Sequence, residues 1–229
     1  MLIINPKVLV PVNEVSDEKL KRVERYGRVC YKSEDRITDK TSEKFVNGII
    51  SSGHESVIEH EKITVLIVTD RGISHEIVRH RIGSYSQEST RYCNYSKEQF
   101  TNQITFIAPF FFEQNSEAFE IWKESCQKAE QSYMKLLSLG KVPQEARSIL
   151  PNSLKTELVV TYNLREWRHF FKLRCSPQAH PQMRQIAIPL LLYFQDKLPS
   201  IFEGIDYDVN FSKVNMAQII ECDYDLISF

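Results

Sequence analysis

Apolar residues recur at helical intervals in one long segment of the chain and at strand-like density in several short ones. In the long segment, residues 116–139, one apolar stripe repeats every three or four residues, at Phe119, Trp122, Cys126, Ala129, Tyr133 and Leu136. Gly140 follows directly and predicts the end of this helix. Residues 62–69, KITVLIVT, are rich in β-branched side chains and predict a strand.

Weaker patterns, together with capping residues and glycines, predict the other elements. Further helices are predicted over residues 17–31, 41–52, 70–81, 164–175 and 181–198. Further strands are predicted over residues 2–12, 104–107 and 157–162, and a polar loop over residues 83–94. Long amphipathic helices combined with few strands, which do not alternate regularly with them, indicate an α+β or irregular α/β fold rather than a doubly wound sheet.

Composition is that of an ordinary globular protein, with 42% hydrophobic and 26% charged residues among 229. No repeat, low-complexity tract or linker interrupts the chain, so we expect a single domain over residues 1–229. The first residues, MLIINP, lack the layout of a signal peptide, and no apolar run reaches the ~20 residues of a membrane span. Five scattered cysteines without a C-x-x-C pair indicate reduced thiols and a cytoplasmic protein.

The net charge of -1 provides no global field that would attract nucleic acid or a membrane surface. Strong anion binding must therefore be local. The sequence contains no Gly-x-Gly, which excludes both the dinucleotide-binding fingerprint and the phosphate-binding P-loop. A protein of this kind would have to bind phosphate through arginine, lysine, serine or helix N-termini.

The segment of residues 79–92, RHRIGSYSQESTRY, is the strongest candidate for local anion binding. It combines three arginines and one histidine with several hydroxyl groups, and guanidinium forks match phosphate and carboxylate oxygens in pairs. Composition alone is equally consistent with a solvated basic helix end. The shortage of nearby acids favours the binding site, because only Glu88 offers compensation there.

Histidines at positions 54 and 60 resemble a zinc motif, HESVIEH, but they are six residues apart. On a helix this spacing turns them to different faces, which disfavours chelation of one metal. The segment is equally consistent with a loop that donates hydrogen bonds to a ligand.

Residues 163–174, NLREWRHFFKLR, predict a helix that could serve two ligands. Arg165 and His169 are one turn apart on a shared face, whereas Arg174 is directed about half a turn away. A structural alternative is a helix that buries its aromatic residues and leaves its charges in water. Cys175 follows directly and is a candidate nucleophile, although no base is fixed beside it and buried inert cysteines are commoner.

Taken in order, these segments resemble the flavin-dependent thymidylate synthases. The family signature is R-H-R, seven variable residues and S, which here is Arg79-His80-Arg81 through Ser89, continuing into Arg91-Tyr92. The resemblance extends to Gly53-His54-Glu55-Ser56 with Glu59-His60, to Glu145-Ala146-Arg147 with Leu150-Pro151, and to Asn163-x-Arg165 ending in Leu173-Arg174. It therefore covers about residues 53–187, most of the chain.

The resemblance implies a thymidylate synthase-complementing fold, with a central, mostly antiparallel sheet flanked by long helices. It implies a methyltransferase that converts dUMP to dTMP with FAD, methylenetetrahydrofolate and NADPH or NADH, in homotetramers whose subunits share active sites. Because a flavin performs the hydride step itself, the protein would supply only positioning and electrostatics. Partners would be these small molecules, without nucleic acid, membrane or metal.

The resemblance also assigns the site residues. FAD would be bound by Ser56, Arg79, His80, Arg81, Gln87, Asn163, Arg165 and His169. The nucleotide would be bound by Glu76, Arg79, Gln87, Glu88, Ser89, Thr90, Arg91, Arg147 and Arg174. Arg174 would be catalytic, because it would favour the ionised N3 form of uracil and stabilise developing negative charge.

The sequence departs from the family pattern at several of these positions. Gln87 stands where many relatives have Glu, and His169 stands where others have Asn, and both replacements keep hydrogen-bonding ability. Glu76 replaces a common Gln and adds a negative charge near an anionic ligand. Residues 175–180, CSPQAH, depart from the family pattern, and no role is assigned to them.

Three other readings follow from the same residues. An RNA-binding module would use the Arg/Ser/Tyr segment for phosphate contact and stacking, although the near-neutral charge argues against it. A metal-dependent hydrolase would use the histidines at positions 54, 60, 75 and 80. Ser89 would need a base to act as a nucleophile, and none is identifiable, so binding is its expected role.

Overall fold

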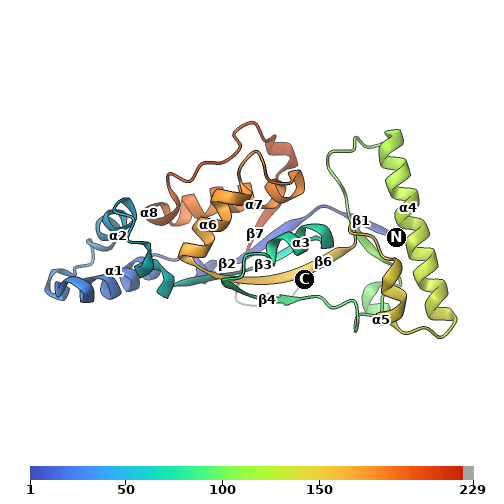
Figure 1. Ribbon diagram of the computed structural model, residues 1–229, viewed down its shortest axis with the longest axis horizontal. Helices are drawn as coiled ribbons and strands as arrows, with labels where there is room; N and C mark the ends of the chain where they lie inside the picture. The colour runs from blue at the N-terminus through green and yellow to red at the C-terminus, as the bar shows by residue number, and fades with distance from the viewer. Residues whose placement is uncertain (224–229) are drawn as a thin grey trace. The chain divides into compact units, whose positions relative to one another are not determined.

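The structure is a computed structural model that describes residues 1–223, so residues 224–229 of the predicted domain lie outside the described residues. Its helices are α1 (Glu18–Tyr31), α2 (Ser42–Ser51), α3 (Arg71–Ile77), α4 (Glu117–Ser138), α5 (Pro143–Ala146), α6 (Leu164–Arg174), α7 (Pro181–Lys197) and α8 (Pro199–Phe202) (Figure 1). Its strands are β1 (Leu2–Ile4), β2 (Lys7–Pro11), β3 (Lys62–Asp70), β4 (Gly83–Gln87), β5 (Thr105–Ile107), β6 (Lys155–Asn163) and β7 (Gln218–Cys222).

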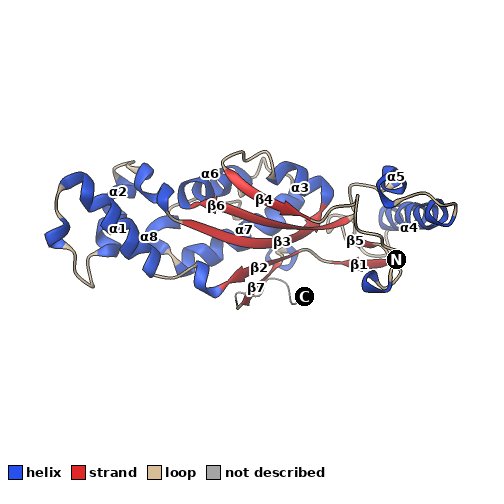
Figure 2. Ribbon diagram, turned by 90° about the horizontal axis from the view of Figure 1, so that it is seen from below, coloured by secondary structure: helices blue, strands red, loops and turns tan. Residues whose placement is uncertain are grey.

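Five strands form one sheet in the order β4-β6-β3-β2-β7, and β1 pairs in parallel with β5 in a smaller sheet (Figure 2). The larger sheet is mostly antiparallel and is combined with helices, so the predicted α+β class is confirmed. Strand β3 is buried at nearly every position, which explains its continuous apolar sequence, whereas β6 alternates between buried and half-buried residues. No helix within residues 1–223 is long and apolar enough to cross a membrane.

The chain divides into two compact units, which we describe separately. Unit 1 comprises residues 1–7, 67–79 and 86–158, and unit 2 comprises residues 8–66, 80–85 and those from 159 onward. The division falls within strands β2, β3, β4 and β6. The single domain expected over residues 1–229 stays a prediction.

In unit 1, helix α4 packs its apolar stripe into a small core. Ser116 caps the start of the helix, because its side chain accepts a hydrogen bond from a backbone N–H of the first turn, and Gly140 ends it with a φ of 83°. Cys126 and Tyr133 on the stripe are buried against Phe106 and neighbouring apolar residues. The predicted long helix is therefore confirmed.

In unit 2, helices α6, α7 and α8 share an aromatic core, and α6 lies beside α7 (Figure 1). Trp167 and Phe171 of α6 stack with their ring centroids 5.5 Å apart, and Phe194 of α7 meets Phe202 of α8 at 5.1 Å. The indole N–H of Trp167 donates to a backbone oxygen of β3 at 3.0 Å, which ties α6 to the sheet. Burial of this face directs the polar side chains of α6 away from the core.

The strand predicted over residues 2–12 is two strands in the structure. The chain leaves the first at Asn5 and Pro6 and enters β2 at Lys7. Proline has no N–H for a sheet hydrogen bond, which accounts for the interruption.

The helix predicted over residues 70–81 is shorter in the structure, since α3 ends at Ile77. Asp70 caps its start as expected, and its Oδ1 accepts the backbone N–H of Ile73 at 2.9 Å. His80 is buried and hydrogen-bonded through its ring to residues of α6, so the chain leaves the helix to place it there.

The loop predicted over residues 83–94 is wrong at its beginning, where β4 forms. Ser84 and Ser86 are exposed, whereas Tyr85 and Gln87 are half-buried, so the strand alternates as expected for one at the edge of a sheet. All four side chains are polar, and hydrophobic periodicity therefore gave no signal. The Tyr85 hydroxyl lies 2.9 Å from that of Tyr162 on β6, which helps to fix the pairing of the two strands.

Candidate active site

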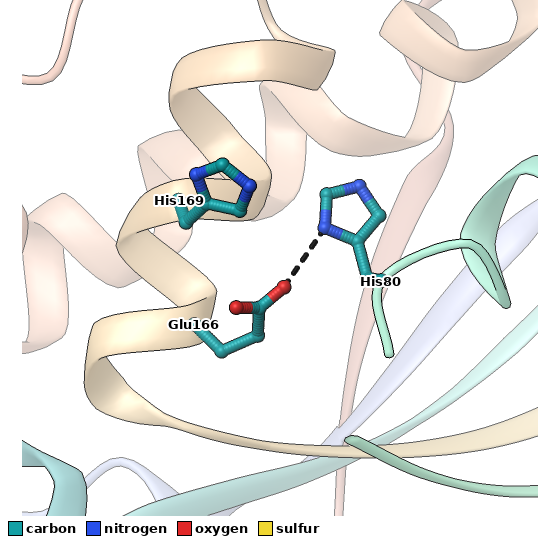
Figure 3. A group of neighbouring side chains, drawn as sticks. All are labelled: His80, Glu166 and His169. Carbon is teal, nitrogen blue, oxygen red and sulfur yellow. Dashed lines mark hydrogen bonds and ion pairs between the residues drawn. The ribbon is translucent and has the colours of Figure 1, made fainter. Parts of the chain in front are cut away.

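The centre of the site in unit 2 is His80, whose two ring nitrogens contact two residues of α6. Nδ1 lies 2.9 Å from Oε1 of Glu166 (Figure 3). Nε2 accepts a hydrogen bond from Nε–H of Arg174 at 3.0 Å. Because Nε2 is an acceptor, the ring proton must be on Nδ1, where it is donated to the carboxylate. The three residues thus form one hydrogen-bonded chain, Glu166–His80–Arg174.

His80 is 5% exposed, and its surroundings favour the neutral imidazole. Burial lowers its pKa below the usual 6.5; the hydrogen bond to Glu166 opposes this shift, and the charge of Arg174 adds to it. A neutral ring is also the only form whose Nε2 can accept from a guanidinium. The electrostatics and the geometry therefore agree on the same tautomer.

Helix α6 presents its partners to His80 through simple spacing. Glu166, Phe170 and Arg174 recur every four residues and so lie on one face of the helix. Asn163 caps the helix start, because its Oδ1 accepts the backbone N–H of Glu166 at 2.8 Å. The Phe170 ring meets the edge of the His80 ring with centroids 5.0 Å apart, which orients the imidazole.

A hollow of about 490 Å³, the α6 hollow, lies beside this chain and is lined by Glu55, Glu59, Ile82, Asn163, Arg165, Glu166, His169 and Lys172. Arg165 already has a partner there, since its Nη1 lies 2.5 Å from Oε1 of Glu59. That contact raises the pKa of the exposed Arg165 guanidinium. Glu55 is similarly engaged by the buried Arg168 at 3.0 Å. The hollow is therefore lined by two cations, Arg165 and Lys172, and by three carboxylates, each of which already has a partner.

Three neighbouring side chains, His80, Glu166 and His169, each offer an atom that could bind a metal, and these atoms lie within 4.8 Å of one another (Figure 3). Such a group is able in principle to hold a metal ion. However, both nitrogens of His80 are already hydrogen-bonded, one of them to a guanidinium whose charge would repel a cation. The arrangement fits an anion-binding site better than a metal site.

Unit 1 contains most of the residues predicted to bind the nucleotide, and several contact one another. Thr90 is buried, and its Oγ1 accepts from Nη1 of Arg147 at 3.2 Å. Gln87 donates its two amide N–H groups to the hydroxyls of Ser74 at 2.8 Å and Thr156 at 3.1 Å. Only the carbonyl oxygen of Gln87 is therefore left for a ligand.

Glu88 is neutralised from within unit 1. Its carboxylate accepts from Lys155 at 3.0 Å and from the Tyr95 hydroxyl at 2.9 Å. Burial and the nearby Glu88 charge raise the pKa of Tyr95, so this hydroxyl remains a donor. Glu88 thus compensates Lys155, whereas the sequence suggested that it compensates the neighbouring arginines.

The other predicted residues are more accessible. Ser89 and Glu76 are half-buried, and the exposed ones are Ser56, Arg79, Arg81, Arg91 and Arg147. The guanidinium of Arg91 lies over the ring of Tyr92, 5.4 Å from its centroid. Ser56 lies in the short 3-10 helix η3 (Glu55–His60), whose flanking Glu55 and Glu59 line the α6 hollow.

The two sets of predicted residues separate between the two units. Six of the eight residues predicted for FAD are in unit 2, and eight of the nine predicted for the nucleotide are in unit 1. Arg174 is the exception in the nucleotide set. Its hydrogen bond to His80 connects a residue predicted for the nucleotide with one predicted for FAD. Sequence reasoning missed Glu166, although its four-residue spacing from Phe170 and Arg174 was an available signal.

The zinc motif and the cysteine nucleophile considered from the sequence both fit the structure poorly. His54 contacts the hydroxyl of Tyr31 at 3.2 Å, whereas His60 packs against the ring of Tyr26, so the two histidines have different surroundings. Cys175 is fully buried, and burial raises the pKa of its thiol. A protonated, inaccessible thiol is not a nucleophile.

Fold and site together define a class of protein: an α+β protein with a polar site in which cationic side chains are paired with carboxylates. The family model described as thymidylate synthase complementing protein matches residues 12–200. The chain is 36% identical to a flavin-dependent thymidylate synthase of Pyrococcus furiosus, over 72% of this chain and 68% of that protein. It is 34% identical to one of Mycolicibacterium vanbaalenii, over 86% and 84%.

This chain therefore belongs to the flavin-dependent thymidylate synthase family, and the resemblance noted in its sequence is confirmed. A crystal structure of the UMP/dUMP methylase PolB from Streptomyces cacaoi, bound with 5-Br dUMP, superposes with a TM-score of 0.69. That match covers 89% of this chain and 96% of the other at 20% identity, and it supports the fold.

Proposed function

We propose that this chain converts dUMP to dTMP by reductive methylation, with methylenetetrahydrofolate as the carbon donor and NADPH or NADH as the reductant. Membership in a family of flavin-dependent enzymes makes a flavin its cofactor, and we infer that this flavin is FAD. The observation that carries the proposal is the hydrogen-bonded chain Glu166–His80–Arg174, which fixes an arginine beside the α6 hollow. The hollow and the chain share Glu166.

The donors and acceptors of the α6 hollow fit a flavin dinucleotide. Arg165 and Lys172 match a pyrophosphate, and the carboxylates of Glu55 and Glu59 match ribose hydroxyls. Asn163 and His169 line the same hollow. From the family assignment we add His80, Arg81 and Ser56 in unit 2 and Arg79 and Gln87 in unit 1. When bound, the flavin supplies the hydride chemistry, and these side chains hold and orient it.

For the nucleotide we propose the polar residues of unit 1. Arg147 and Thr90 are already hydrogen-bonded to each other, and a phosphate could accept from the same guanidinium and hydroxyl. Arg91 and Ser89 would add donors, and Gln87 would accept through its carbonyl oxygen. Glu76, Arg79 and Glu88 of unit 1 and Arg174 of unit 2 complete the nucleotide set.

Arg174 is the residue we propose to be catalytic. His80 occupies its Nε–H, which orients the guanidinium plane through a neutral acceptor that does not cancel the positive charge. A cation held in this way would stabilise negative charge that develops on the uracil ring, including the N3-ionised form. Glu166 and His80 would act through Arg174 as positioning residues.

We also propose that the chain is one domain, acts as a homotetramer with shared active sites, and works in the cytoplasm. The proposed partners are small molecules alone, and we propose no nucleic acid, membrane or metal ion as a partner. The tetramer would allow residues of different subunits to complete one site.

The direct test is spectroscopic and enzymatic. Purified protein should be yellow, show flavin absorbance, and oxidise NADPH faster when dUMP is added, with formation of dTMP. Arg174→Ala should retain flavin and lose most dTMP formation. Protein that stays colourless after incubation with FAD would refute the function, and an Arg174→Ala variant that loses FAD but binds dUMP would refute the role of Arg174.

A further inference from the structure

A second hollow in unit 2 is lined almost entirely by cationic, aromatic and small residues. This basic pocket has a volume of about 620 Å³ and is lined by Arg28, Tyr31, Arg36, Lys40, Thr41, Lys44, Phe45, Gly48, Ile49, Ser52 and His54. It lies on α1, α2 and the segment between them, and the two helices pack against each other (Figure 1). Its size is within the range of small-molecule sites.

The cations of the basic pocket differ in whether they have partners. Arg28 is engaged, because it donates to the buried Glu24 at 2.8 Å and lies over the Phe45 ring at 4.6 Å. Arg36, Lys40 and Lys44 are exposed and form no ion pair with any residue in the part of the chain that the structure describes. Arg28 therefore forms a fixed wall, and the other three are available to a ligand.

Acidic residues occur in the same segment but do not line this pocket. Asp39 and Glu43 line a separate hollow of about 270 Å³ with Asp17, Lys21 and Lys40, and Lys40 lines both hollows. Of the eleven residues that line the basic pocket, none is acidic. The lining of the basic pocket therefore carries only positive charge, in a chain whose net charge is -1.

Gly48 lines the basic pocket from within α2. It lies inside α2, where glycine is less favourable than alanine, yet a Cβ at this position would meet no atom within 4 Å. A larger side chain would therefore extend into free space on the pocket side.

The basic pocket and the α6 hollow are lined by consecutive residues, His54 and Glu55 respectively. His54 is held at this junction by its contact with Tyr31, whose ring is 57% exposed. The basic pocket therefore adjoins the hollow proposed for the flavin, and a co-substrate that contacts this flavin could extend toward Arg36, Lys40 and Lys44.

We propose that the basic pocket binds the anionic tail of a co-substrate, an inference that rests on the proposed function. The tail must carry two or more negative charges to engage the three free cations. Two co-substrates of the proposed reaction have such chemistry: the glutamyl carboxylates of the folate and the 2′-phosphate of NADPH. The aromatic and apolar wall of Phe45 and Ile49 would contact the uncharged part of the tail.

Direct binding to the flavin-loaded protein tests the site without turnover. Penta-γ-glutamate and adenosine 2′,5′-bisphosphate represent the two tails, and calorimetry at low ionic strength measures their Kd. One probe should bind, and the combined change Arg36→Gln, Lys40→Gln and Lys44→Gln should raise its Kd about tenfold. The matched control replaces three exposed lysines elsewhere, Lys128, Lys135 and Lys141, by Gln and should leave the Kd within about twofold.

Gly48 provides a second pair of variants that does not alter charge. Gly48→Leu should fill the pocket and raise the same Kd about tenfold, whereas Gly48→Ala should not. Both replacements favour the helix, so loss of folding does not explain a loss of binding.

Steady-state kinetics then identify the tail. If the folate is bound, pentaglutamyl folate should have a lower KM than monoglutamyl folate, and the triple variant should abolish the difference with little change in kcat. If NADPH is bound, the preference for NADPH over NADH should collapse instead. Wild-type protein that forms dTMP yet binds neither probe, or binds one with the same Kd as the triple variant, would overturn the proposal and leave the proposed function standing.

Discussion

Replacement of Glu166 by Leu should displace the Arg174 guanidinium, although Glu166 contacts His80 and acts on Arg174 only through it. The carboxylate of Glu166 is 2.9 Å from Nδ1 of His80 and holds the ring proton there. Without that acceptor, the buried imidazole is expected to move its proton to Nε2 to avoid an unsatisfied Nδ1–H. Nε2–H would then face Nε–H of Arg174, two donors at a present separation of 3.0 Å, and the guanidinium would turn away.

The magnitude follows from the hydrogen bonds that are lost. A hydrogen bond to a charged donor contributes about 1.5–3 kcal/mol, which corresponds to roughly 10–150-fold in rate if Arg174 acts only when held by His80. Loss of the buried acceptor should also lower the free energy of unfolding by about 1–3 kcal/mol. The KM for dUMP should rise together with the fall in kcat, because Arg174, whose guanidinium turns away, belongs to the nucleotide set.

The assay measures dTMP formation, flavin content and thermal unfolding of the same preparations. Glu166→Gln is the matched control, since its amide oxygen still accepts from Nδ1–H, and it should keep kcat within about threefold. A flavin-loaded, folded Glu166→Leu enzyme with wild-type kcat would show that the hydrogen-bonded chain does not position Arg174. Equal losses in the Leu and Gln variants would assign the effect to the charge of Glu166 instead of its acceptor.

Three further outcomes are expected. Gly83→Ala should lower the free energy of unfolding by about 1–3 kcal/mol in a thermal or urea melt, because the added Cβ would overlap the buried ring of Tyr162; an unchanged melt would contradict the packing. Below about pH 6.5, activity and the stability contributed by neutral His80 should both fall as pH drops through its lowered pKa, because protonation removes the acceptor of Arg174. His80→Gln should not show this loss of activity at low pH. If the variant still loses activity in the same pH range, His80 is not the cause. The Cys175 thiol should react with a thiol reagent only on unfolding, and Cys175→Ala should keep kcat; rapid reaction of native Cys175 would refute its burial.

Elements with strong periodicity could be predicted well from the sequence. The stripe on α4 and its end at Gly140 gave that helix, and the apolar run of β3 gave a buried strand. Local signals failed where distant contacts decide the conformation. Strand β4 has a polar sequence and is fixed by Tyr162 and Thr156 of its neighbour β6, which no local pattern reveals.

The candidate site shows the same limit at the level of single residues. The arginines and His80 could be selected from the sequence because guanidinium and imidazole groups are chemically conspicuous. The partners of the candidate residues could not be predicted. Glu166 binds His80 across 86 residues of sequence, Lys155 binds Glu88 across 67, and Glu59 binds Arg165 across 106. Carboxylates are common on helices, and only the fold determines which of them neutralises a particular cation.

The partners also explain how a chain of near-neutral charge can bind several anions. In the α6 hollow, Arg165 begins paired with Glu59, so a phosphate that binds there exchanges one carboxylate partner for another anion. In the basic pocket, Arg36 and Lys44 begin without ion pairs, so an arriving anion gains the whole interaction and displaces only water and salt. Screening by added salt weakens both the old and the new pair in the first case and only the new pair in the second. Binding at the basic pocket should therefore depend more steeply on ionic strength than flavin binding, because its cations have no carboxylate partner before the ligand arrives.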